Sequence, residues 1–194
     1  MKSLEKRVRW SINKSKNNDI DVSIINSNQK YIEHFYQLHE NSMRAKNGKP
    51  KPKTIFSSIQ KNFKPNNDYD IFVATKNDIP IGYLLVFYFN QYTEYYMPAY
   101  EPEYRNLQST SHLIWESMLK SLDLNKKYFN FGGTWLGQKD LYRFKRGWNT
   151  NNFHYNYYIN CDLDRLKNLE IENFPKLFQD FYVCPYDLLN KKLS

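Results

Sequence analysis

The sequence has few cysteines and no long apolar segment. These two features argue against a disulfide-rich protein and against one that spans a membrane. Cys161 and Cys184 are the only cysteines among 194 residues, so no disulfide framework or zinc-binding spacing is visible and a reducing, cytoplasmic compartment is expected. No apolar run approaches the roughly 20 residues that span a bilayer. The first twenty residues lack the apolar core of a secretory signal. The four histidines show no spacing such as HExxH, so no metal is expected.

Acidic residues are absent or scarce in two stretches, which makes the charge uneven. The net charge is +8, and the 41% hydrophobic and 18% aromatic content argues against a disordered chain. The first seventeen residues carry six basic residues and one acid, and the stretch from Arg44 to Lys64 carries seven basic residues and no acid. This balance favours an anionic partner, such as nucleic acid, a phosphorylated metabolite or an acidic membrane. The alternative is a solvated lysine-rich face.

Hydrophobic periodicity predicts one domain in which helices pack on a sheet. Strands are predicted over residues 21–26, 68–77, 81–90, 93–100, 127–133 and 152–161. Helical spacing predicts helices over 28–48, 53–63, 109–125 and 138–148. Short links at 77–78 and 90–91 favour antiparallel hairpins. The predicted fold class is therefore α/β, or α+β, with a mixed sheet.

Three motifs in this order resemble one family of enzymes. They are "FYQLHENSMRAKNGKPKP" at 35–52, "EYRNLQSTSHLIWESM" at 103–118, and "YFNFGGTW" at 128–135 followed by "LYRFKRGW" at 141–148. Together they resemble the FemAB-like branch of the GNAT superfamily of N-acyltransferases, which includes the aminoacyltransferases that build peptidoglycan cross-bridges. Those enzymes have two such domains, whereas this chain has room for one.

The resemblance implies a GNAT-like fold with a mostly antiparallel sheet and helices packed on both faces. The acyltransferase domain is expected at residues 21–160. Residues 1–20 are expected to form an irregular basic leader. Residues 161–194 are expected to form a helical extension packed on the same domain.

The resemblance also implies a donor site where two neighbouring strands splay apart. A glycine pair at the end of a strand lets the chain turn without Cβ clashes, so a ligand can approach the backbone closely. The stretch at 104–112 stands where GNAT enzymes that use coenzyme A bind pyrophosphate, but it lacks their glycines. The donor is therefore expected to be acyl-CoA or aminoacyl-tRNA. The expected donor-binding residues are Arg105, Ser109, Thr110, Ser111, Gly132, Gly133 and Phe144.

Three residues are the candidates for catalysis. Lys145 belongs to the Phe-Lys pair of the family motif, and its ammonium can stabilise a developing oxyanion or bind a donor phosphate. Tyr142 resembles the tyrosine with which many GNAT enzymes protonate the leaving thiolate, although its spacing to the following glycine differs. Glu94 can accept the proton of the amine. The candidates for binding the acceptor are Arg44, Tyr96 and Trp135.

Strand alternation makes a more specific prediction for this region. Glu94 and Tyr96 are expected on one face of their strand, and Tyr95 and Met97 on the other.

The sequence therefore predicts an acyltransferase that moves an acyl or aminoacyl group onto a primary amine and forms an amide. The acceptor would be an amino sugar, a cell-envelope precursor or a small peptide. Transfer RNA and a second copy of the chain are further candidate partners. The alternative is a catalytically inactive module of the same fold that binds RNA or an anionic glycan through basic segments and exposed tyrosines.

Overall fold

The computed structural model describes residues 1–45, 48–134, 138–155, 160 and 162. The chain divides into two compact units, Met1–Asn151 and Asn152–Ser194. Almost all described residues belong to the first unit, which contains every helix and strand given below. The helical extension expected at 161–194 lies outside the described residues except for Asp162.

The first unit contains a five-stranded sheet in the order β1-β2-β3-β4-β5. The strands are β1 (Asp21–Ile24), β2 (Tyr69–Lys76), β3 (Ile79–Phe89), β4 (Tyr92–Tyr100) and β5 (Tyr128–Asn130). The first four strands pair antiparallel, and β5 pairs parallel with β4, so the predicted mixed sheet is confirmed. The β2–β3 hairpin turns at Asn77 and Asp78, whose positive φ angles of 49° and 64° suit a tight two-residue turn.

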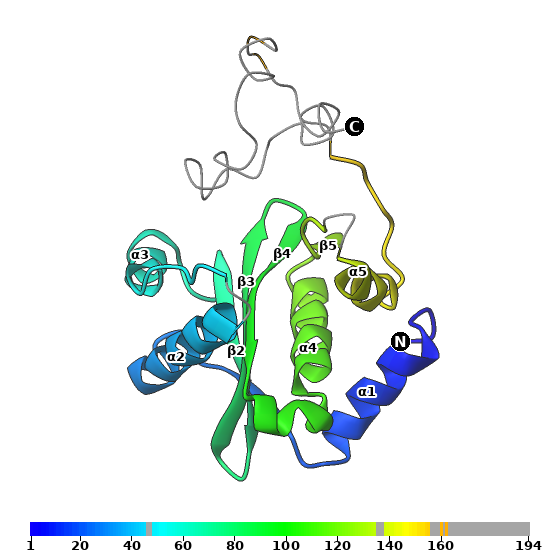
Figure 1. The fold of residues 1–194 in the computed structure, drawn as a ribbon, viewed down its shortest axis with the longest axis horizontal. Coiled ribbons are helices and arrows are strands. Elements are labelled where there is room, and N and C mark those ends of the chain that lie inside the picture. The colour runs from blue at the N-terminus through cyan, green and yellow to red at the C-terminus, as the bar shows by residue number, and fades with distance from the viewer. Residues whose placement is uncertain (46–47, 135–137, 156–159, 161, 163–194) are drawn as a thin grey trace, which may run out of the picture. The chain divides into compact units, whose positions relative to one another are not determined.

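Helices cover both faces of this sheet, as the resemblance implied (Figure 1). On one face lie α2 (Gln29–Ala45) and α3 (Thr54–Asn62), whose apolar stripes pack against β3 and β4 around Phe35, Tyr83 and Met97. On the other face lie α1 (Lys6–Lys16), α4 (Ser109–Asp123) and α5 (Lys139–Arg146). A short 3-10 helix, η1 (Pro102–Leu107), joins the end of β4 to α4.

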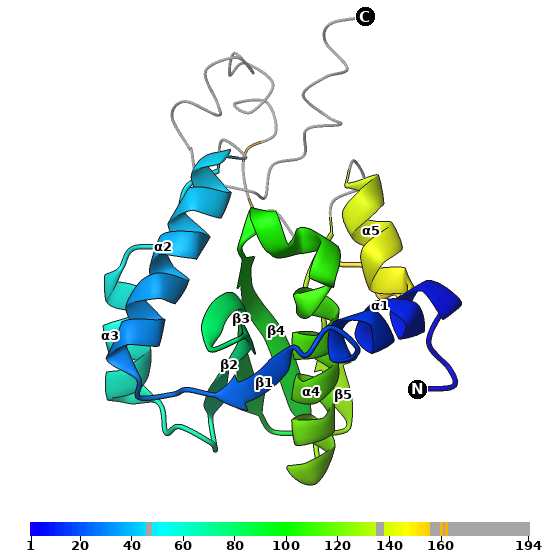
Figure 2. The same cartoon turned by 90° about the horizontal axis from the view of Figure 1, so that it is seen from below.

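The expectation of an irregular leader at residues 1–20 was wrong, because residues 6–16 form α1. Val8 and Ile12 are four residues apart, so they share one face of the helix, and both are buried, as is Leu4 just before the helix. Figure 2 shows α1 lying across α4, far from α2 and α3. The abundant lysine and asparagine concealed this narrow apolar stripe in the sequence.

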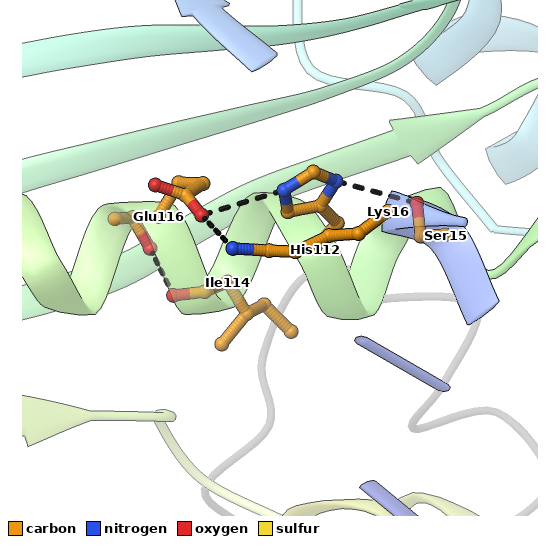
Figure 3. A network of polar contacts seen from close by, with 6 residues as sticks. Ser15, Lys16, His112, Ile114 and Glu116 are labelled. Carbon is orange, nitrogen blue, oxygen red and sulfur yellow. Dashed lines mark hydrogen bonds and ion pairs between the residues drawn. The ribbon is translucent and has the colours of Figure 1, made fainter. Parts of the chain in front are cut away.

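A partly buried polar network fastens α1 to α4. His112 on α4 lies between Ser15, at 3.4 Å from its Nδ1, and Glu116, at 3.3 Å from its Nε2 (Figure 3). The ammonium of Lys16 donates to the same Glu116 carboxylate at 2.9 Å. Burial is the main cause that lowers the pKa of His112, and Lys16 adds to it while Glu116 opposes it. Burial therefore favours the neutral imidazole, whereas the contact with Glu116 favours the protonated one.

Two predicted strands differ from the structure. β5 covers only 128–130 of the predicted 127–133, because Gly132 and Gly133 turn the chain away from the sheet. In the strand expected at 152–161, residues 152–155 and 160 are not in a strand, and 156–159 and 161 lie outside the described residues.

Candidate functional site

The edge strand β5 pairs with only the first part of β4. β5 pairs with β4 through three residue pairs, the last of which joins Glu94 and Asn130. β5 then ends, whereas β4 continues to Tyr100. From Tyr95 onward, this edge of β4 has no strand partner among the described residues. Its backbone N–H and C=O groups form an edge along which an extended ligand can bind.

A β-bulge lies at the point where the two strands separate. Met97 pairs with Leu85 and Tyr95 pairs with Val86, so Tyr96 is an extra residue with no partner of its own. As a result, Tyr96 and Met97 both pack in the core beneath α2, while Tyr95 packs on the opposite face. The prediction that Met97 shares a face with Tyr95 was therefore wrong, because strict alternation fails at a bulge.

Lys145 fixes the glycine turn beside this point. Its Nζ donates hydrogen bonds to the carbonyl oxygens of Gly133, at 2.7 Å, and Gly132, at 3.1 Å. The side chain is buried, with 9% exposed, although it lies on a helix with several exposed cations. Burial lowers the pKa of Lys145, and attraction to Glu94 opposes that change. Gly132 itself has φ +68°, a left-handed conformation that glycine adopts without strain.

Asn130 connects this turn to Glu94. The Asn130 Nδ2 donates to Glu94 Oε2 at 2.7 Å, and the Gly132 N–H donates to Asn130 Oδ1 at 2.9 Å. Burial raises the pKa of Glu94, while the hydrogen bond from Asn130 and the charge of Lys145 oppose that rise. A half-buried carboxylate with a raised pKa is a suitable proton acceptor.

Asn130 was missed in the sequence, although a signal was present. An asparagine side chain commonly accepts a hydrogen bond from the backbone N–H two residues later, and Gly132 stands at that position. Glu94, Asn130, Gly132, Gly133 and Lys145 together form the cluster that we call the glycine-turn site.

The helix that carries Lys145 is supported by α1. The Glu5 N–H donates to the Gly147 carbonyl at 3.1 Å, and Arg7 Nη2 donates to the Arg143 carbonyl at 3.3 Å. Phe144, expected at the donor site, lies in the core on this face and meets the Trp148 ring edge-on at a centroid distance of 6.5 Å. Tyr142 is 40% exposed and lies one helical turn before Lys145.

The other residues expected to bind the donor lie at the start of α4, beyond the end of β4. Ser109 and Ser111 are buried, Thr110 is half-buried, and Arg105 is exposed on η1. Ser109 packs so closely on β3 that a Cβ at Gly82 would lie 3.1 Å from its Oγ. Arg105 and Thr110 are thus the more accessible members of this group.

The expected acceptor residues are not gathered in one place by any described contact. Arg44 is exposed near the end of α2 and pairs with Glu40 of the same helix at 2.8 Å. Tyr96 lies at the bulge, where the Lys51 ammonium is 4.8 Å from its ring centroid. Trp135 lies outside the described residues.

Among the described residues, no three histidine, cysteine or acidic side chains gather as a metal site would require. No helix in the described ranges has the length and apolar character needed to cross a membrane.

Comparisons with known proteins agree with this architecture. A family model described as acetyltransferase (GNAT) domain matches residues 2–146. No curated protein matches the sequence.

Among solved structures, the chain is similar to the crystal structure of FemX, with 15% identity and a TM-score of 0.67, over 76% of this chain and 54% of that one. It is also similar to the aminoglycoside acetyltransferase meta-AAC0020 from an uncultured soil metagenomic sample, in complex with sisomicin, with 13% identity and a TM-score of 0.56, over 75% and 99%.

A further similar structure is AAC(6')-Iy in complex with the bisubstrate analogue CoA-S-monomethyl-acetylneamine, with 13% identity and a TM-score of 0.53, over 73% and 99% of the two chains. At such identities, the likeness shows a shared fold. The chain spans about half the length of FemX.

Proposed function

Because the chain belongs to the GNAT acetyltransferase domain family, we propose that it transfers an acyl group to a primary amine and forms an amide. The observation that carries this proposal is the free edge of β4 beyond Glu94, with the carboxylate of Glu94 at its start. An acyl donor can extend along this edge and place its carbonyl carbon near Glu94. The N–H groups of β4 that have no strand partner among the described residues are then available to the carbonyl oxygen as negative charge develops on it.

The reaction needs two proton transfers, and the site offers a group for each. The amine nitrogen bonds to the donor carbonyl carbon, and the bond from that carbon to sulfur, or to oxygen in an ester donor, breaks. Glu94, whose pKa is raised by burial, accepts the proton that the amine loses. We assign the return of a proton to the leaving group to Tyr142, one turn from Lys145 on α5.

In this proposal, Lys145 holds the conformation of the glycine turn and favours the ionised form of Glu94. Two of its N–H groups are already bonded to the carbonyls of Gly132 and Gly133. These bonds support a role in holding the glycine turn and in keeping Glu94 ionised, rather than contact with the oxyanion.

We propose acyl-CoA as the donor. The start of α4 lies at the end of the free β4 edge, and a helix N-terminus with the exposed Arg105 beside it is suited to a diphosphate. One solved neighbour with this fold was crystallised with a coenzyme A bisubstrate analogue.

A specific observation favours aminoacyl-tRNA as the alternative donor. Trp10 is 55% exposed on α1, and the Lys14 ammonium lies 4.9 Å from its ring. Arg7 of α1 donates to the backbone carbonyl of Arg143 on α5, so the basic side chains of these two helices adjoin. A cationic surface with an exposed aromatic ring can bind phosphates and stack on a base.

The test is to measure acyl transfer to a panel of small amines with acetyl-CoA and, in parallel, with aminoacylated bulk tRNA. Glu94→Gln removes the proposed base and is expected to lower kcat/KM by about 10²- to 10⁴-fold. Glu103→Gln, on the exposed surface of η1, is the matched control and should behave as wild type. Equal rates for wild type and Glu94→Gln would refute the role of Glu94. Ligand binding without transfer from either donor would favour the inactive binding module.

A further inference from the structure

Three exposed aromatic side chains lie in a row across the starts of β4 and β5 and the end of β3. In the ladder, Tyr92 pairs with Phe89 on one side and with Tyr128 on the other. Residues paired in this way point to the same face of a sheet. The exposed fractions are 74% for Phe89, 50% for Tyr92 and 54% for Tyr128, and the two tyrosine rings stack at a centroid distance of 4.9 Å. We call these three residues the aromatic row.

The aromatic row lies on the same face of the sheet as Glu94. Tyr92 and Glu94 are two residues apart along β4, and Tyr128 and Asn130 are two apart along β5. Residues with this spacing in a strand share a face and are separated by roughly 7 Å. Glu94 pairs with Asn130 and with Phe87, which packs in the core beneath α2 and α3. The row is therefore the next step of the sheet beyond the pair that forms part of the glycine-turn site.

The cover of this face ends just before the aromatic row. Phe63, directly after α3, packs on Phe87 at a centroid distance of 5.3 Å and is itself 43% exposed. On the opposite face the same stretch of β4 is covered, because Thr93 is buried and donates to Ser121 of α4 at 2.8 Å. The described part of the chain thus leaves the row open to solvent on the side of Glu94. Adjoining exposed apolar side chains of this kind often mark a binding site.

The chemistry of the row favours a sugar ring as its occupant. None of the three side chains carries a charge, so the row suits a neutral part of a ligand. Aromatic rings offer apolar surface, and the two tyrosines add hydroxyl groups that can donate and accept hydrogen bonds. A sugar ring combines a face of C–H groups with a rim of hydroxyl groups, so it matches both features, whereas a hydrocarbon chain matches only the first.

We propose that the aromatic row is a subsite for the ring of a sugar acceptor, and that it places the amine of that acceptor at Glu94. The inference rests on the proposed acyl transfer and names the class of its acceptor. The row acts by positioning: the ring packs against Tyr92 and Tyr128, and the amine on or beside that ring reaches the carboxylate one step further along β4. An open-chain amine reaches Glu94 as well but gains little from the row.

The experiment compares two acceptors that differ in the ring, with acetyl-CoA as donor. Methyl β-glucosaminide has a locked pyranose ring. Glucosaminitol is the open-chain form, with a primary amine on the same carbon and a comparable set of hydroxyl groups. For both compounds, kcat/KM is measured by thiol release, and Kd is measured by calorimetry in the presence of coenzyme A.

The expected result is a preference for the ring compound that depends on the aromatic row. Contact with an aromatic ring corresponds to about 2- to 12-fold in affinity. Tyr92→Ala and Tyr128→Ala should each reduce the preference, the double variant should abolish it, and Tyr128→Phe should retain most of it. Ile79→Ala removes an exposed apolar side chain at the opposite end of β3 and should leave the preference unchanged.

A thermal melt of each variant shows whether it is folded. Phe89→Ser, on the neighbouring strand, tests the row again if an alanine variant of β4 or β5 does not fold. It should also reduce the preference for the ring compound.

The outcomes separate the two proposals. Transfer to both acceptors at equal kcat/KM by the wild type would overturn the subsite and leave acyl transfer standing. Tighter binding of the ring compound that the double alanine variant abolishes, without any transfer, would support the subsite and count against the enzyme. A preference that survives in the double variant, or no binding of methyl β-glucosaminide, would overturn the inference.

A second copy of the chain is the competing occupant of the row. Sedimentation velocity of the wild type and of the double alanine variant tests it. A monomeric wild type agrees with a subsite that is open to a sugar. A wild-type dimer that the double variant converts to a monomer would overturn the inference and assign the row to an interface between copies.

Discussion

Replacing Lys145 with methionine tests the glycine-turn site most directly. Methionine keeps most of the apolar stem of lysine but cannot donate to the carbonyls of Gly132 and Gly133. Hydrogen bonds from charged groups contribute about 1.5–3 kcal/mol each to stability. Two effects reduce that sum here. Gly133 is exposed, so water can replace the lysine, and the lowered pKa of Lys145 shows that burying its charge has a cost.

The expected loss in the free energy of unfolding is therefore about 1–3 kcal/mol rather than the full sum of two bonds. For a chain of this size, that loss lowers the Tm by about 2 to 12 °C. Urea denaturation followed by tryptophan fluorescence measures it, because Trp148 is buried on the same face as α5.

The matched control is Lys139→Met, which removes an exposed cation from the first turn of α5. Surface substitutions of this kind usually change stability by less than about 0.5 kcal/mol. If Lys145→Met and Lys139→Met unfold at the same urea concentration with the same m-value, the two hydrogen bonds of Lys145 do not hold the turn. In that case, the argument that Lys145 shapes the site would fail.

Three further perturbations have expected outcomes that unfolding experiments can check. Gly132→Ala should cost about 1–2 kcal/mol because its φ is +68°, whereas Gly133→Ala, without a left-handed φ, should cost less. Gly82→Ala should destabilise by about 1–3 kcal/mol, because the new Cβ would lie 3.1 Å from Ser109 Oγ. Burial lowers the pKa of His112, so the unfolded chain binds its proton first as the pH falls below about 6.5. Stability should then fall below that pH, and His112→Gln should make the decline shallower. The free energy of unfolding of the wild type and of His112→Gln is measured at pH 7.5 and at pH 5.5.

The features that the sequence predicted correctly arise from neighbouring residues. The β2–β3 hairpin depends on the backbone preferences of Asn77 and Asp78 and on the apolar runs at either side. The α2 helix follows from apolar residues at helical spacing, and Gly132 ends β5 because glycine alone adopts its conformation without strain. Such local signals also explain why the GNAT fold could be recognised.

Other features depend on which distant segments meet. α1 is helical and fixed because Val8 and Ile12 find a buried surface, whereas its composition alone is polar. The bulge at Tyr96 exists only in the register of β4 against β3, and no pattern within β4 marks it. Sequence reasoning therefore placed Met97 on the wrong face.

The sequence by itself determined most of the helices and strands but not α1, and it determined the glycine turn and the motif that contains Lys145. Only the tertiary structure decided that the Lys145 ammonium turns inward to the carbonyls of Gly132 and Gly133, and that Asn130 holds Glu94. The physical reason is that these bonds join β4, β5 and α5 across separations of 12 to 36 residues. Hydrogen bonds between such segments form only after the folded core has brought their polar groups together and removed most of the competing water.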